Sequence, residues 1–189
     1  MITLYLDFDG VILDTITISN SYIKDNDITD EQEIHNYFEN LDWRDLMSRS
    51  HIINNAIENI WKIYESGLFK IGIITHYNSI QEVMLKDKFI TDNLPNDIVV
   101  HYVHHSNKKN SKVDAYNAVL VDDFRRNLKF WEEDGGIGIK FSDTDKECEF
   151  LKINSLDEII NLYETIKERI ENNKIKRRTY GVKKYYRYL

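Results

Sequence analysis

Ile-Thr-Leu-Tyr-Leu-Asp-Phe-Asp-Gly, residues 2–10, is the stretch of sequence that decides the fold. Residues 2–8 form one short run of β-branched, aromatic and aliphatic side chains around a single carboxylate, which is typical of a buried central strand. The run ends at Asp9-Gly10, a pair that favours a turn. The sequence therefore predicts that two carboxylates, Asp7 and Asp9, lie at the carboxyl end of a strand.

A helical region follows this strand. Apolar residues in 15–66 recur at helical spacing, and Thr29 with Gln32 makes a capping-box pattern at the start of one helix. A second apolar stripe begins at Ile53 and is closed by Gly67, a residue type that often ends helices. We predict that residues 15–66 form a small helical cap inserted after the first strand.

Strand and helix patterns then alternate to the end of the domain. Strands are predicted at 69–77, 97–103, 118–123 and 136–141, with helices at 79–94 and 124–134 and a last helix from the Ser155 to Glu158 capping box. Such alternation implies crossover connections and a mainly parallel sheet. We predict an α/β fold, a three-layer Rossmann-like core from 1–14 and 67–173.

Composition narrows the class of protein. The 189 residues are 42% hydrophobic, 12% aromatic and 30% charged, which is ordinary for a globular domain and excludes a disordered chain. A lone cysteine, Cys148, excludes an internal disulfide and a thiolate zinc site. With no secretory leader pattern and no apolar run of membrane-spanning length, we expect a cytoplasmic protein without membrane contact.

The charge is unevenly distributed. Residues 174–189 carry seven bases and no acids, so this tail contributes +7 and leaves −14 on the rest of a chain whose net charge is −7. Four tyrosines lie among these bases, a composition typical of segments that track a nucleic-acid backbone. A frayed chain end, or a surface that docks on the acidic body or on a second subunit, is the alternative interpretation, and no pattern indicates the oligomeric state.

Polar side chains end several of the predicted strands. Asp7 and Asp9 end the first, Thr75 and His76 the next, and Asp122 and Asp123 a later one, while Lys112 lies just before that last strand. Ligands of open α/β sheets collect beyond the carboxyl ends of the strands. Four carboxylates gathered there repel one another unless a hard cation neutralises them, and an oxygen-only donor set favours Mg²⁺. We predict a magnesium site at Asp7, Asp9, Asp122 and Asp123.

These residues resemble four sequence motifs of the haloacid dehalogenase (HAD) superfamily of phosphohydrolases. The matching segments are Asp7 to Val11, Ile73 to Thr75, Lys112, and Leu120 to Asp123. The resemblance implies that Asp7 is the nucleophile, that Asp9 is the general acid and base, and that Thr75 and Lys112 hold the phosphoryl group. Spacing favours Lys112 over Lys108 and Lys109 as the motif lysine.

The substrate is less strongly indicated than the chemistry. The small cap and the Lys-x9-Asp-Asp spacing resemble the 5'(3')-deoxyribonucleotidases, which implies a nucleoside monophosphate as substrate. Candidate substrate-binding residues are Thr75, His76, Trp43, Arg44, Lys109 and Arg125, for several of which packing or an exposed helix surface is the alternative. A sugar phosphatase or phosphomutase of the same superfamily, or a protein that processes or binds nucleic-acid ends through the basic tail, remains the alternative function.

Overall fold

The computed structural model describes residues 1–144 and 147–185, with side chains described as far as Ile175. In this part of the chain a six-stranded sheet has the order β3-β2-β1-β4-β5-β6, and every neighbouring pair is parallel. The strands are β1 (Ile2–Leu6), β2 (Phe69–Tyr77), β3 (Val99–His104), β4 (Val119–Asp122), β5 (Ile137–Phe141) and β6 (Leu151–Ile153). The predicted parallel α/β sheet is confirmed, and the short edge strand β6 is an addition that the sequence did not indicate.

Helices occupy the connections. The helices are α1 (Thr15–Asp25), α2 (Glu31–Asn40), α3 (Trp43–Arg49), α4 (Ala56–Ser66), α5 (Ile80–Asn93), α6 (Arg125–Glu133), α7 (Glu158–Asn161) and α8 (Tyr163–Tyr185), with short 3₁₀ turns η1 (Ile53–Asn55) and η2 (Lys109–Ser111). None of the helices in the described residues is long and apolar enough to cross a membrane.

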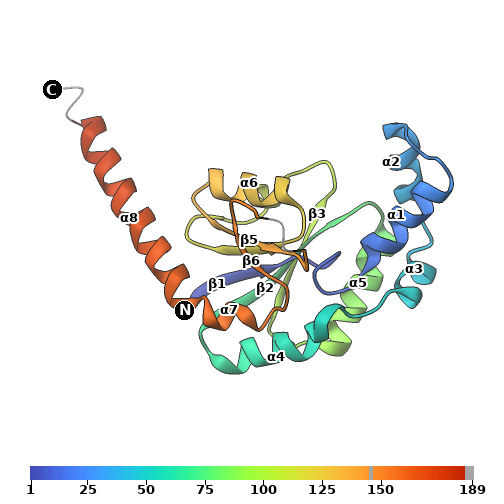
Figure 1. The fold of residues 1–189 in the computed structure, drawn as a ribbon, viewed down its shortest axis with the longest axis horizontal. Coiled ribbons are helices and arrows are strands. Elements are labelled where there is room, and N and C mark those ends of the chain that lie inside the picture. Colours follow the sequence, from blue (N-terminus) through green and yellow to red (C-terminus); the bar gives the residue numbers. More distant parts are fainter. Residues whose placement is uncertain (145–146, 186–189) are drawn as a thin grey trace.

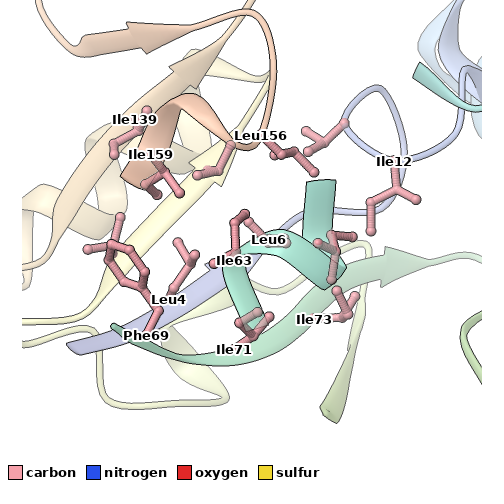
Figure 2. Close-up of a cluster of buried hydrophobic side chains, with 14 of the residues drawn as sticks. Leu4, Leu6, Ile12, Ile63, Phe69, Ile71, Ile73, Ile139, Leu156 and Ile159 are labelled. Carbon is pink, nitrogen blue, oxygen red and sulfur yellow. The ribbon is translucent and has the colours of Figure 1, made fainter. Parts of the chain in front are cut away.

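Helices cover both faces of the sheet, which gives the predicted three layers (Figure 1). On one face, Leu4 and Leu6 of β1 pack in a cluster with Ile63 of α4 and Ile159 of α7, as Figure 2 shows. On the other face, Leu120 and its neighbours pack around Trp131 of α6. Side chains alternate between the faces along each strand, so the apolar run in β1 serves both layers.

The helices of residues 15–66, which the sequence predicts to form a cap, lie in two different places. Helices α1 to α3 lie together to one side of the sheet (Figure 1). Helix α4 instead packs on the sheet, because Ala56, Ile60 and Ile63 belong to the main hydrophobic cluster. Gly67, with φ of 65°, ends α4 in the left-handed conformation that the sequence suggested.

Two helix boundaries differ from expectation. Asp30, not Thr29, caps α2, since its Oδ1 accepts the backbone N–H groups of Gln32 and Glu33 at 2.9 and 3.2 Å. At the end of the domain, the backbone N–H of Ser155 donates to Glu158 Oε1 at 3.2 Å, as in the predicted capping box. The single helix expected there is divided into α7 and α8.

The C-terminal helix α8 projects away from the sheet (Figure 1). Its backbone runs to Tyr185. The predicted basic tail, 174–189, lies almost entirely outside the described side chains, so its role stays a prediction.

Candidate active site

The carboxyl ends of three adjacent strands form the site. Strand β1 lies between β2 and β4, and the backbone N–H of Asp7 donates to the carbonyl of Val121 at 3.0 Å, which continues the pairing beyond the end of β1. Residues that follow β1 and residues that end β2 and β4 therefore meet at one edge of the sheet. The structure brings together Asp7, Asp9, Thr75 and Asp122, as the sequence predicts.

Asp7 is almost fully enclosed, with 6% of its surface exposed. Its Oδ1 accepts the backbone N–H of Phe8 at 2.7 Å, and its Oδ2 lies 2.6 Å from Nζ of Lys109. Burial raises the pKa of the Asp7 carboxyl well above its ordinary value; the ammonium of Lys109 opposes this rise, and the nearby carboxylate of Asp122 adds to it.

The lysine that contacts Asp7 is Lys109. This corrects our prediction that Lys112 is the lysine of the site. Lys109 Nζ bridges Asp7 and Asp122 at 2.6 and 2.7 Å, and only 2% of the residue is exposed. Lys112 is exposed and follows the turn η2, whose fold buries Lys109 instead. Burial alone lowers the pKa of the Lys109 ammonium, but the two carboxylates outweigh it and the net shift is upward, so the cation persists.

Asp122 and Asp123 differ in their surroundings. Asp122 is fully buried, and its oxygens accept the backbone N–H of Phe124 at 2.7 Å and the side-chain amide of Asn127 at 2.9 Å. Burial, followed by repulsion from Asp122, raises the pKa of Asp123 to about 6. Gly10, with φ of 71°, passes close enough that a Cβ atom there would lie 2.5 Å from Asp123 Oδ2.

Three of the four predicted metal ligands form a compact carboxylate cluster. Asp7, Asp122 and Asp123 each offer an oxygen, and these atoms lie within 4.8 Å of one another. Burial first, and then repulsion between the carboxylates, raise the pKa values of Asp7 and Asp123. Of the neighbouring cations, only Lys109 forms ion pairs with this cluster among the described residues. A hard divalent cation with oxygen ligands fits this donor set and this unbalanced charge.

Asp9 has a separate set of partners. Its Oδ1 accepts the hydroxyl of Thr15 at 2.8 Å, and its Oδ2 lies 3.4 Å from the hydroxyl of Thr75. Lys86 Nζ also forms an ion pair with Asp9 Oδ2. The two carboxylates that follow β1 thus have different environments, since Asp7 forms an ion pair with Lys109 and Asp9 forms one with Lys86.

Lys86 and Glu82 are the site residues that the sequence reasoning missed. Both are on α5 and buried, and Lys86 Nζ lies 2.6 Å from Glu82 Oε1 and 3.1 Å from the Thr75 hydroxyl. Burial raises the pKa of Glu82. For Lys86, burial lowers the pKa, but Asp9 and Glu82 outweigh it and the net shift is upward.

The α5 sequence carried a signal for this pair. Its buried face contains Glu82, Lys86 and Ile90 at intervals of four, while the apolar Ile80 and Met84 are 69% and 67% exposed. The i, i+4 spacing of Glu82 and Lys86 is visible in the sequence. The exposure of Ile80 and Met84, which shows that α5 directs this charged pair inward, is seen only in the structure.

A cavity of about 250 Å³ opens over these carboxylates. Its lining includes Asp7, Asp9, Asp123, Thr15, Ile16, Ser19, Phe38, Trp43, His76, Asn78, Glu82, Phe124 and Asn127. Residues of α1, α2 and α3 thus form one wall, and the strand ends form the floor. Of the predicted substrate-binding residues, Trp43 and His76 line the cavity.

Arg44 and Arg125, which we predicted to bind substrate, lie elsewhere. Both are exposed and neither belongs to the cavity lining. His76 donates through Nε2 to the carbonyl of Asn107 at 3.0 Å. Burial, followed by the charge of Lys109, lowers the His76 pKa to about 4, so the imidazole is neutral at neutral pH.

Trp43 joins the cap to the core. It is 3% exposed, and Lys86 Nζ lies 5.1 Å from its ring centroid, within the range of a cation–π contact. Its indole N–H has no hydrogen-bond partner among the described residues, although it is buried. A buried donor without a partner is costly, which favours an acceptor on a bound ligand.

Comparison with known proteins places the fold. No family model and no curated protein matches this sequence. Among solved structures, a HAD-superfamily hydrolase of subfamily IA from Geobacter sulfurreducens is similar with a TM-score of 0.57 and 12% identity, covering 86% of this chain and 96% of that one. A HAD phosphatase from Thermococcus onnurineus gives a TM-score of 0.56 and 15% identity, with 86% and 97% covered.

A putative beta-phosphoglucomutase from Thermotoga maritima is also similar, with a TM-score of 0.55, 14% identity, and 87% and 99% of the two chains covered. Identities this low show a shared fold and leave substrate choice open. The chain therefore has the HAD-like fold that the four motifs implied.

Proposed function

We propose that this protein is a Mg²⁺-dependent phosphomonoesterase that acts through an aspartyl-phosphate on Asp7 and prefers (deoxy)nucleoside monophosphates. One observation carries the proposal. Asp7 and Asp9 leave the same strand end, line the same cavity and are held by two different buried lysines, Lys109 and Lys86. Two carboxylates in contrasting environments suit two different chemical roles.

Asp7 supplies the nucleophile. One oxygen of its carboxylate attacks phosphorus, and the bond between phosphorus and the leaving-group oxygen breaks, which leaves the phosphoryl group on Asp7. Lys109, 2.6 Å from Asp7 Oδ2, fixes the carboxylate and offers positive charge to the incoming phosphate.

Asp9 moves the protons. It donates a proton to the departing alkoxide in the first step, and as a carboxylate it then takes a proton from the water that attacks the phosphorus of the aspartyl-phosphate. This second attack releases phosphate and restores Asp7. Thr15 and Lys86 hold Asp9 on both oxygens, so it stays oriented through both steps.

The carboxylates of Asp7, Asp122 and Asp123 would hold the magnesium ion. When bound, this cation offsets the charge of the cluster and of the phosphate, so that an anionic nucleophile and an anionic substrate can approach. Gly10 keeps the space beside Asp123 free of a side chain.

The cap wall supports a nucleoside as the leaving group. Ile16, Phe38 and Trp43 line the cavity from this wall, and Phe124 lines it from the start of α6. Flat apolar rings suit a planar base. A sugar phosphatase is the rival, since one structural neighbour is a putative beta-phosphoglucomutase.

Phosphate release from a panel of nucleoside monophosphates and hexose phosphates tests the proposal, with wild type and Asp7→Asn, in Mg²⁺ or EDTA. We expect Mg²⁺-dependent release that is absent in Asp7→Asn and fastest with a nucleotide. Faster release from hexose phosphates would overturn the nucleotide assignment, and no release from any substrate would overturn the phosphatase itself.

A further inference from the structure

A second hollow, here called the cationic groove, adjoins the catalytic cavity. It has a volume of about 430 Å³ and lies between the segment that follows β3 and the start of α6. The two elements can be followed in Figure 1. His76, Phe124 and Asn127 line both the groove and the catalytic cavity. The two hollows therefore share a boundary, and a ligand in the cavity lies next to the groove.

The groove is positive in a protein that is negative. The chain has 32 acidic and 25 basic residues, yet the described residues that line the groove include Lys108 and Arg126 and no acid. Lys108 Nζ lies 3.6 Å from the ring centroid of Phe130, and the Arg126 guanidinium lies 5.5 Å from it. Within the described chain neither cation forms an ion pair, so both remain able to bind an external anion.

An exposed aromatic ring stands between the two hollows. Phe124 is 58% exposed although it is large and apolar. A flat ring in this position, flanked by a phosphate-binding cavity and by unpaired cations, fits a planar base with a phosphate on either side.

We propose that the cationic groove binds a second phosphate on the leaving group, so that the preferred substrate is a nucleotide carrying a phosphate beyond the one that is removed. This inference rests on the proposed function, and it extends the preferred substrate from a nucleoside monophosphate to a nucleotide with a second phosphate. The second phosphate belongs either to a nucleoside bisphosphate or to the next linkage of a single strand. Lys108 and Arg126 hold that phosphate, and the base lies against Phe124.

Kinetics test the groove with three substrates: adenosine 5'-monophosphate, adenosine 3',5'-bisphosphate and a 5'-phosphorylated adenosine dinucleotide. We expect kcat/KM for one of the last two to exceed that for the monophosphate by about tenfold or more. The double variant Lys108→Gln/Arg126→Gln should lose this preference and keep its activity on the monophosphate. Whether the bisphosphate or the dinucleotide gains more identifies the source of the second phosphate.

Lys129→Gln is the matched control, since Lys129 is an exposed α6 lysine outside the groove lining that pairs with Glu149 at 3.5 Å. It should keep the preference. Equal kcat/KM for all three substrates, or a preference that survives the double substitution, would overturn the groove assignment while the phosphatase proposal stands.

Binding gives a readout that needs no turnover. Calorimetric titration of Asp7→Asn protein should show tighter binding of the bisphosphate or the dinucleotide than of the monophosphate, with an advantage that shrinks as salt rises and vanishes in the added Lys108→Gln/Arg126→Gln background. If the wild type releases no phosphate at all, this advantage would still support the groove, and equal binding of the three ligands would still overturn it.

Discussion

Lys109 Nζ lies 2.6 Å from Oδ2 of Asp7, and neither residue exposes more than 6% of its surface. The same ammonium lies 2.7 Å from Asp122, so one cation serves two buried carboxylates. A buried charge that loses its partner is strongly destabilising, which ties the fold of the site to its charge balance.

Lys109→Met should therefore abolish phosphate release and lower the free energy of unfolding by about 3–5 kcal/mol. Lys112→Met is the control, because Lys112 is exposed. It should change stability by less than about 0.5 kcal/mol and leave kcat near the wild-type value. Urea denaturation and phosphate release measure the two effects. An inactive Lys112→Met protein beside an active Lys109→Met protein would restore the assignment made from spacing.

A second comparison uses two ion pairs of the same helix. Lys86 is buried against Asp9 and Glu82, whereas Lys88 pairs with Asp92 at 2.8 Å on the exposed face of α5. Lys86→Met should cost about 3–5 kcal/mol of stability, and Lys88→Met about 0–0.5 kcal/mol. We also expect Lys86→Met to reduce kcat by at least roughly tenfold, because Asp9 loses the partner that orients it. Equal losses in the two variants would contradict the role of Lys86.

Alanine substitutions at Gly10 and Gly67 distinguish the effect of backbone strain from the effect of crowding next to Asp123. Both glycines have positive φ, 71° and 65°, but a Cβ at Gly10 would meet Asp123 at 2.5 Å, while one at Gly67 would meet nothing within 4 Å. Each alanine substitution should cost about 1 kcal/mol through strain. Only Gly10→Ala should also reduce Mg²⁺ affinity, measured by calorimetry. Unchanged affinity in Gly10→Ala would place the metal away from Asp123.

The raised pKa of Asp123 predicts how the free energy of unfolding depends on pH. Its pKa rises from 3.8 to about 6 on folding, so between about pH 4 and 6 the folded state binds more protons than the unfolded chain, and stability falls as pH rises through that window. In EDTA at pH 7, Asp123→Asn should therefore be more stable than wild type by about 3 kcal/mol, and equal to it below pH 4.

With Mg²⁺ present, the wild type should become more stable than Asp123→Asn. The cation should raise the unfolding temperature of the wild type at pH 7 and have little effect on Asp123→Asn, because that variant lacks one of the three clustered carboxylates. The exposed Asp25→Asn, at the last residue of α1, serves as a control and should follow the wild type. A magnesium response that is identical in all three proteins would place the cation elsewhere.

The sequence predicted the parts of the fold that depend on local pattern. The apolar run before Asp7 and the alternation of strand and helix patterns after Gly67 predicted the parallel sheet. The polar residues at the strand ends predicted that Asp7, Thr75 and Asp122 lie close together. These inferences succeed because parallel strands end at one edge, whatever packs around them.

What the sequence did not show depends on tertiary packing. The turn η2 decides that Lys109 rather than Lys112 is buried, and spacing does not encode that turn. The amphipathic pattern of α4 is the same for a helix in a cap and for a helix on a sheet. Its position on the sheet therefore depends on tertiary packing, which the pattern does not show. Lys86 was missed because a charged residue on a helix is normally exposed.

Trapping the covalent intermediate tests the central claim, that Asp7 is the nucleophile, most directly. Asp9→Asn protein is mixed with p-nitrophenyl phosphate and Mg²⁺, because this leaving group needs no general acid while the second step still lacks its base. Acid quenching, reduction with borohydride and peptide mass spectrometry then locate the modified aspartate, which is reduced to homoserine. We predict a burst of nitrophenol and homoserine at position 7 alone. A burst with homoserine at another position, or steady turnover with no modified aspartate, would contradict the account.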